Sequence, residues 1–244
     1  MLSIKKLFSG ILFTASLILH TGCTTAQITD ILKQVSSDPT TGEISMGLKE
    51  ALEKGTGISA ERLSLENGYL GNLDVKILFP EEAKNVENTL RSIGLGSMCD
   101  QVITSLNRAA EDAAIAAKPI FTDAIKQMSF QDVQNILLGE KNAATMYFKG
   151  STTSSLSEEF SPIIDSSLDK VDATKYWSDV ITRYNKVPFV KKVDTDLTAY
   201  VTQKAIDGLF LEIAKEELEI RENISARTSP LLQKVFGYAE KQKN

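Results

Sequence analysis

The stretch that decides the fold is TDLTAYVTQKAIDGLFLEIAKEELEIRE, residues 195–222. Its apolar side chains recur at intervals of three and four, which places them along one face of an α-helix. The main stripe and the residues that widen it are Leu197, Val201, Ala205, Leu209 and Ile213, with Ile206, Phe210 and Ile220. A stripe of this width predicts packing on two sides, so we expect this helix at the centre of a bundle.

Helical spacing continues through most of the chain, divided by proline, glycine and capping residues. The expected helices cover 43–54, 80–93, 97–118, 121–128, 129–137, 143–148, 157–168, 172–184 and 229–236. The first of these is expected to stop at Gly55, because glycine commonly ends a helix. Residues 150–157 are rich in serine and threonine, and they are expected to form a loop and helix cap, with a flexible lid or hinge as the alternative.

Only residues 73–79 alternate apolar and polar side chains like a half-buried strand. This segment could pair with a short partner or serve as an extended connector. The sequence therefore predicts an all-α fold: an irregular multi-helix bundle around a long C-terminal central helix, with at most one short β segment near 73–79.

The composition fits one globular domain with a sizeable core. The chain has 244 residues, of which 42% are hydrophobic and 24% charged. We divide it into a signal peptide (1–22), a tether with a weak helix (23–40), a single helical domain (41–238) and a polar tail (239–244).

The first segment is an export signal. Lys5 and Lys6 precede the mostly apolar stretch 7–19, and small residues follow it. This order is typical of a secretory signal peptide, and the apolar stretch is shorter than the roughly 20 residues that a membrane span requires. We therefore expect the rest of the chain to be exported.

Gly22-Cys23 resembles the end of a bacterial lipoprotein signal, in which the cysteine becomes the lipidated N-terminus. The resemblance departs at His20, where leucine is usual. The alternative is ordinary cleavage after Ala26. Lipidation at Cys23 predicts an outer-membrane lipoprotein that faces the periplasm, and cleavage after Ala26 predicts a soluble periplasmic protein.

Removal of residues 1–22 leaves 25 basic and 32 acidic residues, a net charge of −7, and no histidine. An acidic surface repels nucleic acid, so we expect no nucleic-acid partner.

Without histidine, Ser-His-Asp and Cys-His catalysis and histidine-ligated zinc are unavailable. We expect no cofactor and no metal, because acidic pairs such as Glu81 and Glu82 lack the spacing of a calcium loop. With Cys23 lipidated, Cys99 has no disulfide partner and is expected to be buried and inert.

The run Asn107-Arg108-Ala109-Ala110-Glu111 is the main candidate for a site. Asn107 and Glu111 are four residues apart on one helical face, and Arg108 precedes Glu111 by three. The asparagine and carboxylate could orient a substrate while the arginine holds an anion. The interpretation that we favour is a structural polar network between helices, which must be fully paired to be tolerated.

Two further motifs are candidates. Arg227 precedes Thr228-Ser229-Pro230 at an expected helix start, where it could complete an anion-binding site, although an ordinary capping motif is favoured. Asp207-Gly208 interrupts the long helix, and a close helix crossing is the simpler reason for the glycine. Asp207 together with Glu111 could also form the carboxylate pair of a hydrolase.

Several short runs along the chain resemble a family of bacterial exported proteins known only as a domain of unknown function. These runs are 47–52, 67–69, 79–81, 107–111, 143–145, 207–210 and 226–228. The resemblance extends from about residue 28 to 237 and implies an exported, largely helical single domain without an assigned activity. The polar motif residues of the family correspond to Asn107, Arg108, Glu111, Asp207 and Arg227.

Three functions follow from these observations. The favoured one is a non-enzymatic binding or scaffold module of the cell envelope, anchored by its lipidated N-terminus, with an envelope protein or an apolar ligand as partner. The second is a carboxylate-based envelope hydrolase that uses Glu111 and Asp207. The third is a purely structural lipoprotein.

Overall fold

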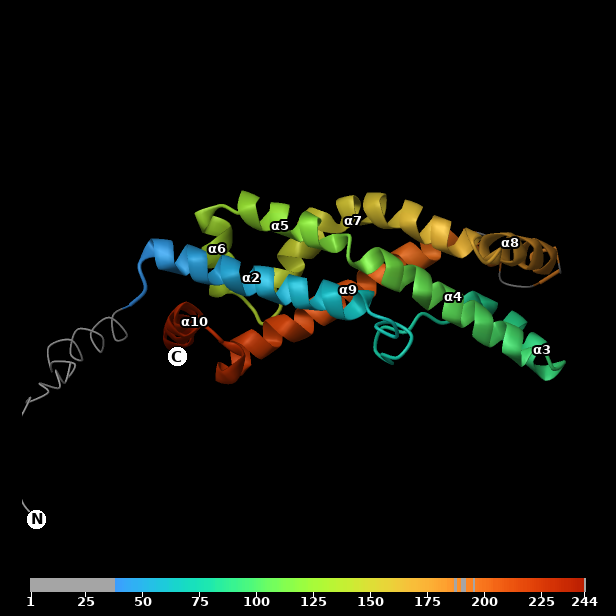
Figure 1. Cartoon of the computed structure of the whole chain (residues 1–244), viewed down its shortest axis with the longest axis horizontal. Coiled ribbons are helices and arrows are strands. Elements are labelled where there is room, and N and C mark those ends of the chain that lie inside the picture. Colours follow the sequence, from blue (N-terminus) through green and yellow to red (C-terminus); the bar gives the residue numbers. More distant parts are fainter. Residues whose placement is uncertain (1–37, 187, 190–191, 195, 244) are drawn as a thin grey trace, which may run out of the picture. The chain divides into compact units, whose positions relative to one another are not determined.

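The computed structural model describes residues 38–186, 188–189, 192–194 and 196–243, and residues 38–244 form one compact unit. The elements, shown in Figure 1, are α2 (Thr41–Ser64), η1 (Glu81–Ala83), α3 (Lys84–Ser92), α4 (Gly96–Ala114), α5 (Ala117–Gln127), α6 (Phe130–Leu137), α7 (Ala143–Asp169), α8 (Ala173–Tyr184), α9 (Leu197–Glu222), η2 (Ile224–Ala226) and α10 (Pro230–Lys243). These described residues contain no β-strand, so the all-α prediction is confirmed. The predicted signal peptide, Cys23 and most of the predicted tether lie outside the described residues.

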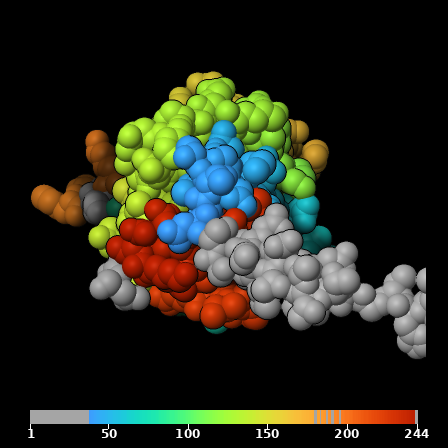
Figure 2. Space-filling view, turned by 90° about the vertical axis from the view of Figure 1, so that its left-hand side faces the viewer, coloured from blue at the N-terminus to red at the C-terminus, as the bar shows by residue number. Residues whose placement is uncertain are grey.

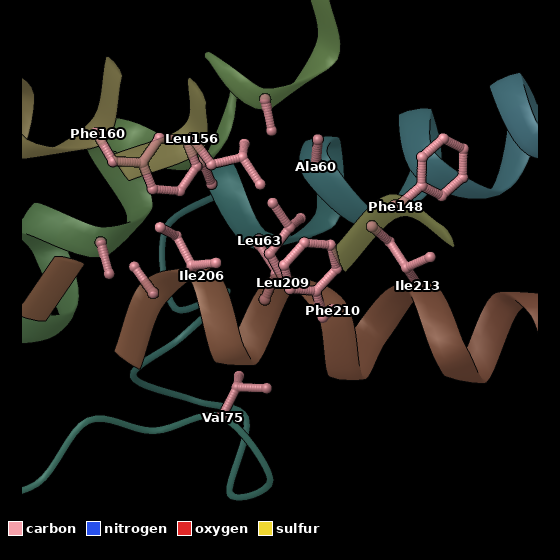
Figure 3. Close-up of a cluster of buried hydrophobic side chains, with 14 of the residues drawn as sticks. Ala60, Leu63, Val75, Phe148, Leu156, Phe160, Ile206, Leu209, Phe210 and Ile213 are labelled. Atoms are coloured by element: carbon pink, nitrogen blue, oxygen red, sulfur yellow. The ribbon is translucent and has the colours of Figure 1, made fainter. Parts of the chain in front are cut away.

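Helix α9 is central, as its broad apolar stripe predicted. It packs against α7, α2, α4 and α8, and the apolar side chains of its predicted stripe are buried. Figure 3 shows four apolar side chains of α9, from Ile206, Leu209, Phe210 and Ile213. They point toward apolar side chains of the helices that lie above α9 in this view, among them Leu63 and Phe148. The ring of Phe210 lies 6.3 Å from that of Phe121, in an edge-to-face arrangement.

Helix α7 corrects the prediction for residues 150–157. The helix runs without a break from Ala143 to Asp169. The hydroxyl groups of Ser151, Thr152 and Thr153 donate to the carbonyl oxygens four residues earlier, at 2.6–2.9 Å. A polar run is therefore compatible with a helix here, because each of these hydroxyl groups donates its hydrogen bond to a carbonyl of the preceding helical turn. The prediction of a loop in this segment was wrong.

Helix α2 also continues past the predicted stop at Gly55 and ends at Ser64. A Cβ atom at Gly55 would lie 3.6 Å from the Cβ of Glu216 on α9, so the glycine lies where two helices pack closely. A Cβ at Gly47 would lie only 2.7 Å from Cγ2 of Val235 on α10. Both glycines therefore serve helix packing rather than helix termination.

Residues 65–80 form a connector between α2 and η1. Within its segment 73–79, residues 73–75 form a turn and residues 76–79 have no regular secondary structure, so the segment is a connector and pairs with no strand among the described residues. Helix α10 continues to Lys243 and Ala239 is buried, so the predicted polar tail at 239–244 overlaps the end of this helix. None of the helices in the described ranges has the length and apolar character needed to cross a membrane.

Candidate functional site

Asn107 of α4 fixes the connector by bonding both backbone groups of one residue. Its Oδ1 accepts from the amide of Ile77 at 2.8 Å, and its Nδ2 donates to the carbonyl of Ile77 at 2.8 Å. The same Nδ2 donates to the carbonyl of Ile103 at 2.7 Å. The side chain is fully buried, so it replaces the pairing that a neighbouring strand would otherwise give.

Glu111 and Arg108 hold the other end of the connector. Oε1 of Glu111 accepts from the amides of Tyr69 and Leu70, each at 3.1 Å, and Oε2 forms an ion pair with Arg108. Arg108 also donates to Oδ1 of Asn67 at 3.0 Å. Of the three predicted residues, Arg108 and Glu111 therefore contact each other, whereas Asn107 bonds a different part of the connector. These contacts join α4 to the connector, whereas the favoured interpretation from the sequence was a network between two helices.

Gly208 leaves room for the buried ring of Tyr69. A Cβ at Gly208 would lie 2.8 Å from Cε1 of Tyr69 and 3.1 Å from Cβ of Val75. The hydroxyl of Tyr69 donates to the carbonyl of Ala205 at 2.7 Å, and burial raises the pKa of this phenol above its usual value. The glycine in the long helix thus has a packing reason, although its neighbour is the connector rather than another helix.

Asp207 is exposed and lies apart from the buried Glu111. Its Oδ1 accepts from the side-chain Nε2 of Gln203 at 3.0 Å. It lines a groove of about 400 Å³ between the connector and α9, together with Lys204 and Tyr200. Burial, with a smaller contribution from nearby glutamates, raises the pKa of Tyr200 to about 12. No hydrogen bond or ion pair joins Asp207 to Glu111, so these contacts do not favour the two acids as a catalytic pair.

Arg227 binds the end of α9. Its Nε donates to the carbonyl of Ile220 at 2.9 Å, its Nη2 donates to that of Arg221 at 2.6 Å, and it forms an ion pair with Glu240. Ser229 accepts a hydrogen bond from the first turn of α10. The segment therefore caps two helices: Arg227 caps the C-terminus of α9, and Ser229 caps the N-terminus of α10.

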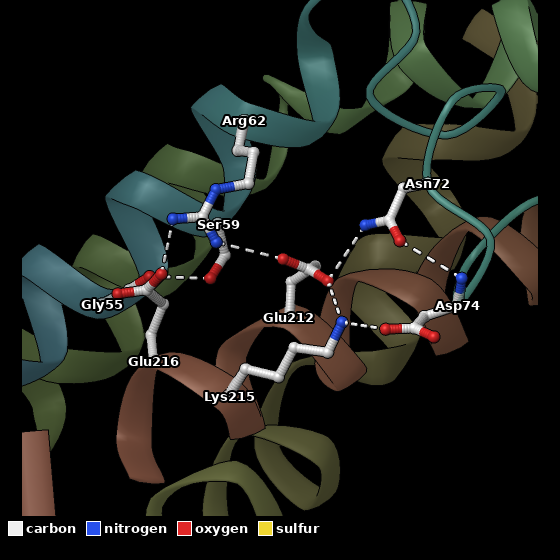
Figure 4. Close-up of polar contacts among 8 residues, drawn as sticks. All are labelled: Gly55, Ser59, Arg62, Asn72, Asp74, Glu212, Lys215 and Glu216. Carbon is white, nitrogen blue, oxygen red and sulfur yellow. Dashed lines mark hydrogen bonds and ion pairs between the residues drawn. The ribbon is translucent and has the colours of Figure 1, made fainter. Parts of the chain in front are cut away.

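A network around Glu212 was not predicted from the sequence (Figure 4). This carboxylate, whose side chain is 3% exposed, contacts Arg62 of α2 at 3.1 Å, Asn72 of the connector at 3.2 Å and Lys215 at 2.7 Å. Lys215 also contacts Asp74 at 2.6 Å. Burial opposes ionisation of Glu212, but these hydrogen bonds outweigh it and lower the pKa of the carboxyl. A single acid inside the apolar run LFLEI was the signal that could have indicated a buried, paired group.

A second buried carboxylate, Glu217 of α9, caps the N-terminus of α7, although the two are far apart in the sequence. It accepts from the amides of Ala144 and Thr145, each at 2.9 Å, and pairs with Arg221 at 2.9 Å. Its neighbour Glu216 pairs with Arg62 at 2.7 Å. The described part of the chain contains no group of three or more histidine, cysteine, aspartate or glutamate residues placed to hold a metal ion. It also contains no buried side-chain nitrogen or oxygen without a hydrogen-bond partner.

A mostly apolar cleft of about 580 Å³ opens at the surface, and we call it the α3–α4–α8 cleft. It is lined by Phe79, Val86, Leu90, Met98, Cys99, Asp100, Gln101, Val102, Thr104, Ser105, Val171, Ala173, Tyr176 and Trp177. The rings of Phe79 and Trp177 lie 5.9 Å apart and form one of its walls. Met98, Val171 and Tyr176 stay 52–62% exposed at this cleft. Its volume falls within the range of small-molecule sites, which are about 300–1,000 Å³.

Cys99 lies in this cleft and is 1% exposed. Burial raises the pKa of its thiol, which lowers the fraction of reactive thiolate. The prediction that Cys99 is buried is confirmed. The cleft itself was missed, because the sequence shows that the helices are amphipathic but does not show where three of them leave a space.

Comparison with known proteins gave one match. A family model described as "Protein of unknown function (DUF4197)" matches residues 38–237. No curated protein and no solved structure matches the chain. The matched range includes α2 to most of α10, and with them the connector and the cleft. It also includes Asn107 and Glu111 of α4, which bind the connector and which we call its clamps.

Proposed function

The chain belongs to the DUF4197 family of proteins of unknown function. Because that description assigns no activity, we propose from the chain's own features that it is an exported, non-enzymatic binding module. Its ligand is an apolar molecule that enters the α3–α4–α8 cleft, and its place is the cell envelope. The observation that carries this proposal is the cleft itself, which is concave, mostly apolar and bordered by a few polar groups, as ligand sites usually are.

The contacts of the polar candidates support a binding function rather than catalysis. Asn107, Glu111 and Arg227 have their polar atoms engaged by other parts of the protein. Removal of the predicted signal peptide would also remove His20, the one histidine in the chain. No observation favours the alternative hydrolase built on Glu111 and Asp207.

The ligand class follows from the shape and chemistry of the cleft. Apolar side chains from three helices and the two tilted rings of Phe79 and Trp177 suit an acyl chain or a flat apolar ring system, and the side-chain amide of Gln101 at the cleft could bond a polar head group. A fatty acid has about 18 non-hydrogen atoms, which at about 0.3 kcal/mol per atom gives a Kd on the order of 100 µM.

The binding test uses Trp177, which is the single tryptophan of the chain and lines the cleft. Titration with the apolar dye N-phenyl-1-naphthylamine should increase dye emission and quench the tryptophan by energy transfer. Palmitate should then displace the dye. Val102→Phe fills the cleft and should weaken dye binding at least tenfold, whereas Met146→Phe, at an exposed position of α7 outside the cleft, is the matched control.

The proposal fails if the dye does not bind, or if Val102→Phe and Met146→Phe bind it equally well while both remain folded by circular dichroism. The proposed export has its own test. Mass spectrometry of the mature N-terminus distinguishes acylation at Cys23 from cleavage after Ala26, and recovery of the intact chain from the cytosol would contradict both.

A further inference from the structure

The loop between α8 and α9 has a fixed base. Nδ2 of Asn185 donates to the carbonyl of Val193 at 2.8 Å, and the amide of Val193 donates to Oδ1 of Asn185 at 2.9 Å. Val193 is buried, and the indole of Trp177 donates to the carbonyl of Asp194 at 3.3 Å. Both ends of the loop are therefore held against the helices.

The tip of this loop carries a phenylalanine that the protein does not cover. Phe189 is 107% exposed and has a φ of 65°, in the left-handed region that a bulky side chain rarely occupies. Glycine or asparagine would fit this backbone better, so neither local conformation nor packing within the chain accounts for phenylalanine. Burial of this ring against another molecule would remove its apolar surface from water and would be favourable.

The same segment has a charge opposite to that of the rest of the protein. Residues 183–192 contain four basic and no acidic residues, whereas the whole chain has a net charge of −5, which leaves −9 for the remainder. Lys186 and Lys192, on either side of Phe189, are exposed. An aromatic tip between lysines is the arrangement found where a protein meets the interface of an anionic membrane.

We propose that the tip formed by Lys186, Phe189 and Lys192 is a membrane-docking site for a bilayer with anionic head groups. Phe189 enters the boundary between head groups and acyl chains, and the two lysines contact phosphate groups. Charge alone would also suit a soluble acidic polymer, but an uncovered phenylalanine gains nothing from one. The inference does not depend on ligand binding in the cleft or on lipidation. Where the protein also carries a lipid anchor, the tip is a second membrane signal, and two signals hold a protein on a membrane more stably than one.

The test uses residues 38–244, which form a compact unit and lack Cys23, so that any binding belongs to the folded unit. Sedimentation measures its binding to vesicles of phosphatidylcholine with 30% phosphatidylglycerol and to vesicles of phosphatidylcholine alone. We expect at least tenfold stronger binding to the anionic vesicles, and a steep loss at 0.5 M salt. Phe189→Ser should weaken binding about tenfold. Lys186→Glu with Lys192→Glu should weaken it at least 25-fold, at about fivefold per lysine removed.

Two matched controls separate the loop from the general surface. Ile224→Ser removes an apolar side chain that is 65% exposed elsewhere, and Lys241→Glu reverses an exposed charge on α10. Each should change vesicle binding less than twofold. All variants should keep the helical circular dichroism of the parent, because the substituted side chains lie on the surface.

A fluorescence measurement tests insertion directly. Trp177→Phe with Phe189→Trp leaves one tryptophan, at the tip, and its emission should shift to shorter wavelength and be quenched by brominated acyl chains. The proposal is overturned if the unit does not bind anionic vesicles, if the controls weaken binding as much as the loop variants, or if the tip tryptophan shows no shift. Binding to polyglutamate or DNA that matches vesicle binding and is insensitive to Phe189→Ser would also overturn it.

Discussion

Replacement of Gly208 by alanine tests whether the connector and α9 are as closely packed as the structure indicates. In an open helix this change stabilises a protein by about 1 kcal/mol, since alanine is the better helix former. Here the new Cβ would meet Cε1 of Tyr69 at 2.8 Å and Cβ of Val75 at 3.1 Å. The ring cannot move away freely, because its hydroxyl bonds the carbonyl of Ala205 at 2.7 Å. Overpacking of this kind costs about 1–3 kcal/mol, and we expect a net loss of about 1 kcal/mol.

Urea unfolding followed by circular dichroism at 222 nm measures this loss. Gly150→Ala in α7 is the matched control, because no atom lies within 4 Å of its added Cβ, and it should raise the free energy of unfolding. The two variants should therefore change stability in opposite directions. In a Tyr69→Phe background the ring is free to shift, so the cost of Gly208→Ala should fall. A Gly208→Ala protein as stable as the parent would refute the close packing of Tyr69 on α9.

Three further predictions concern other buried groups. Asn107→Ala leaves the amide and carbonyl of Ile77 without partners and should cost about 2–4 kcal/mol in the same urea assay, and a loss below about 0.5 kcal/mol would contradict the clamp. The lowered pKa of Glu212 means that its ion pairs stabilise the fold above about pH 4.5 and are lost as the pH falls through the folded-state value. Glu212→Gln should therefore unfold with a weaker dependence on pH in the acid range, and an unchanged pH profile would contradict this role. Cys99 should react with Ellman's reagent only as fast as the protein opens, and immediate reaction in the native state would contradict its burial.

The sequence predicts helices best where packing and local pattern agree. The stripe on α9 is long and broad, so its central position could be read from spacing alone. Single residues and short runs that commonly end a helix predicted the helix boundaries less well. Gly55 lies within α2 because α9 packs closely there, and the run 150–157 stays helical because its hydroxyls bond to the preceding turn. Both errors came from giving local signals more weight than tertiary contacts.

The candidate site shows a similar limit. A polar run among alanines indicated that Asn107 and Glu111 are buried and paired, and both are. Their partners were not predictable, because Ile77 and Tyr69 contribute backbone groups, and a backbone group has no sequence signature. The α3–α4–α8 cleft was equally hidden, since its volume depends on how three helices and the connector meet.

The clamps on the connector also govern when it can form during folding. The amides of Tyr69, Leu70 and Ile77 have their acceptors on α4, which lies 30–42 residues further along the chain. These pairings cannot close until α4 has docked, so the connector should acquire its structure late, after the helical core has assembled. In hydrogen-exchange experiments these three amides should be protected although they belong to no helix, and they should lose that protection together when α4 detaches.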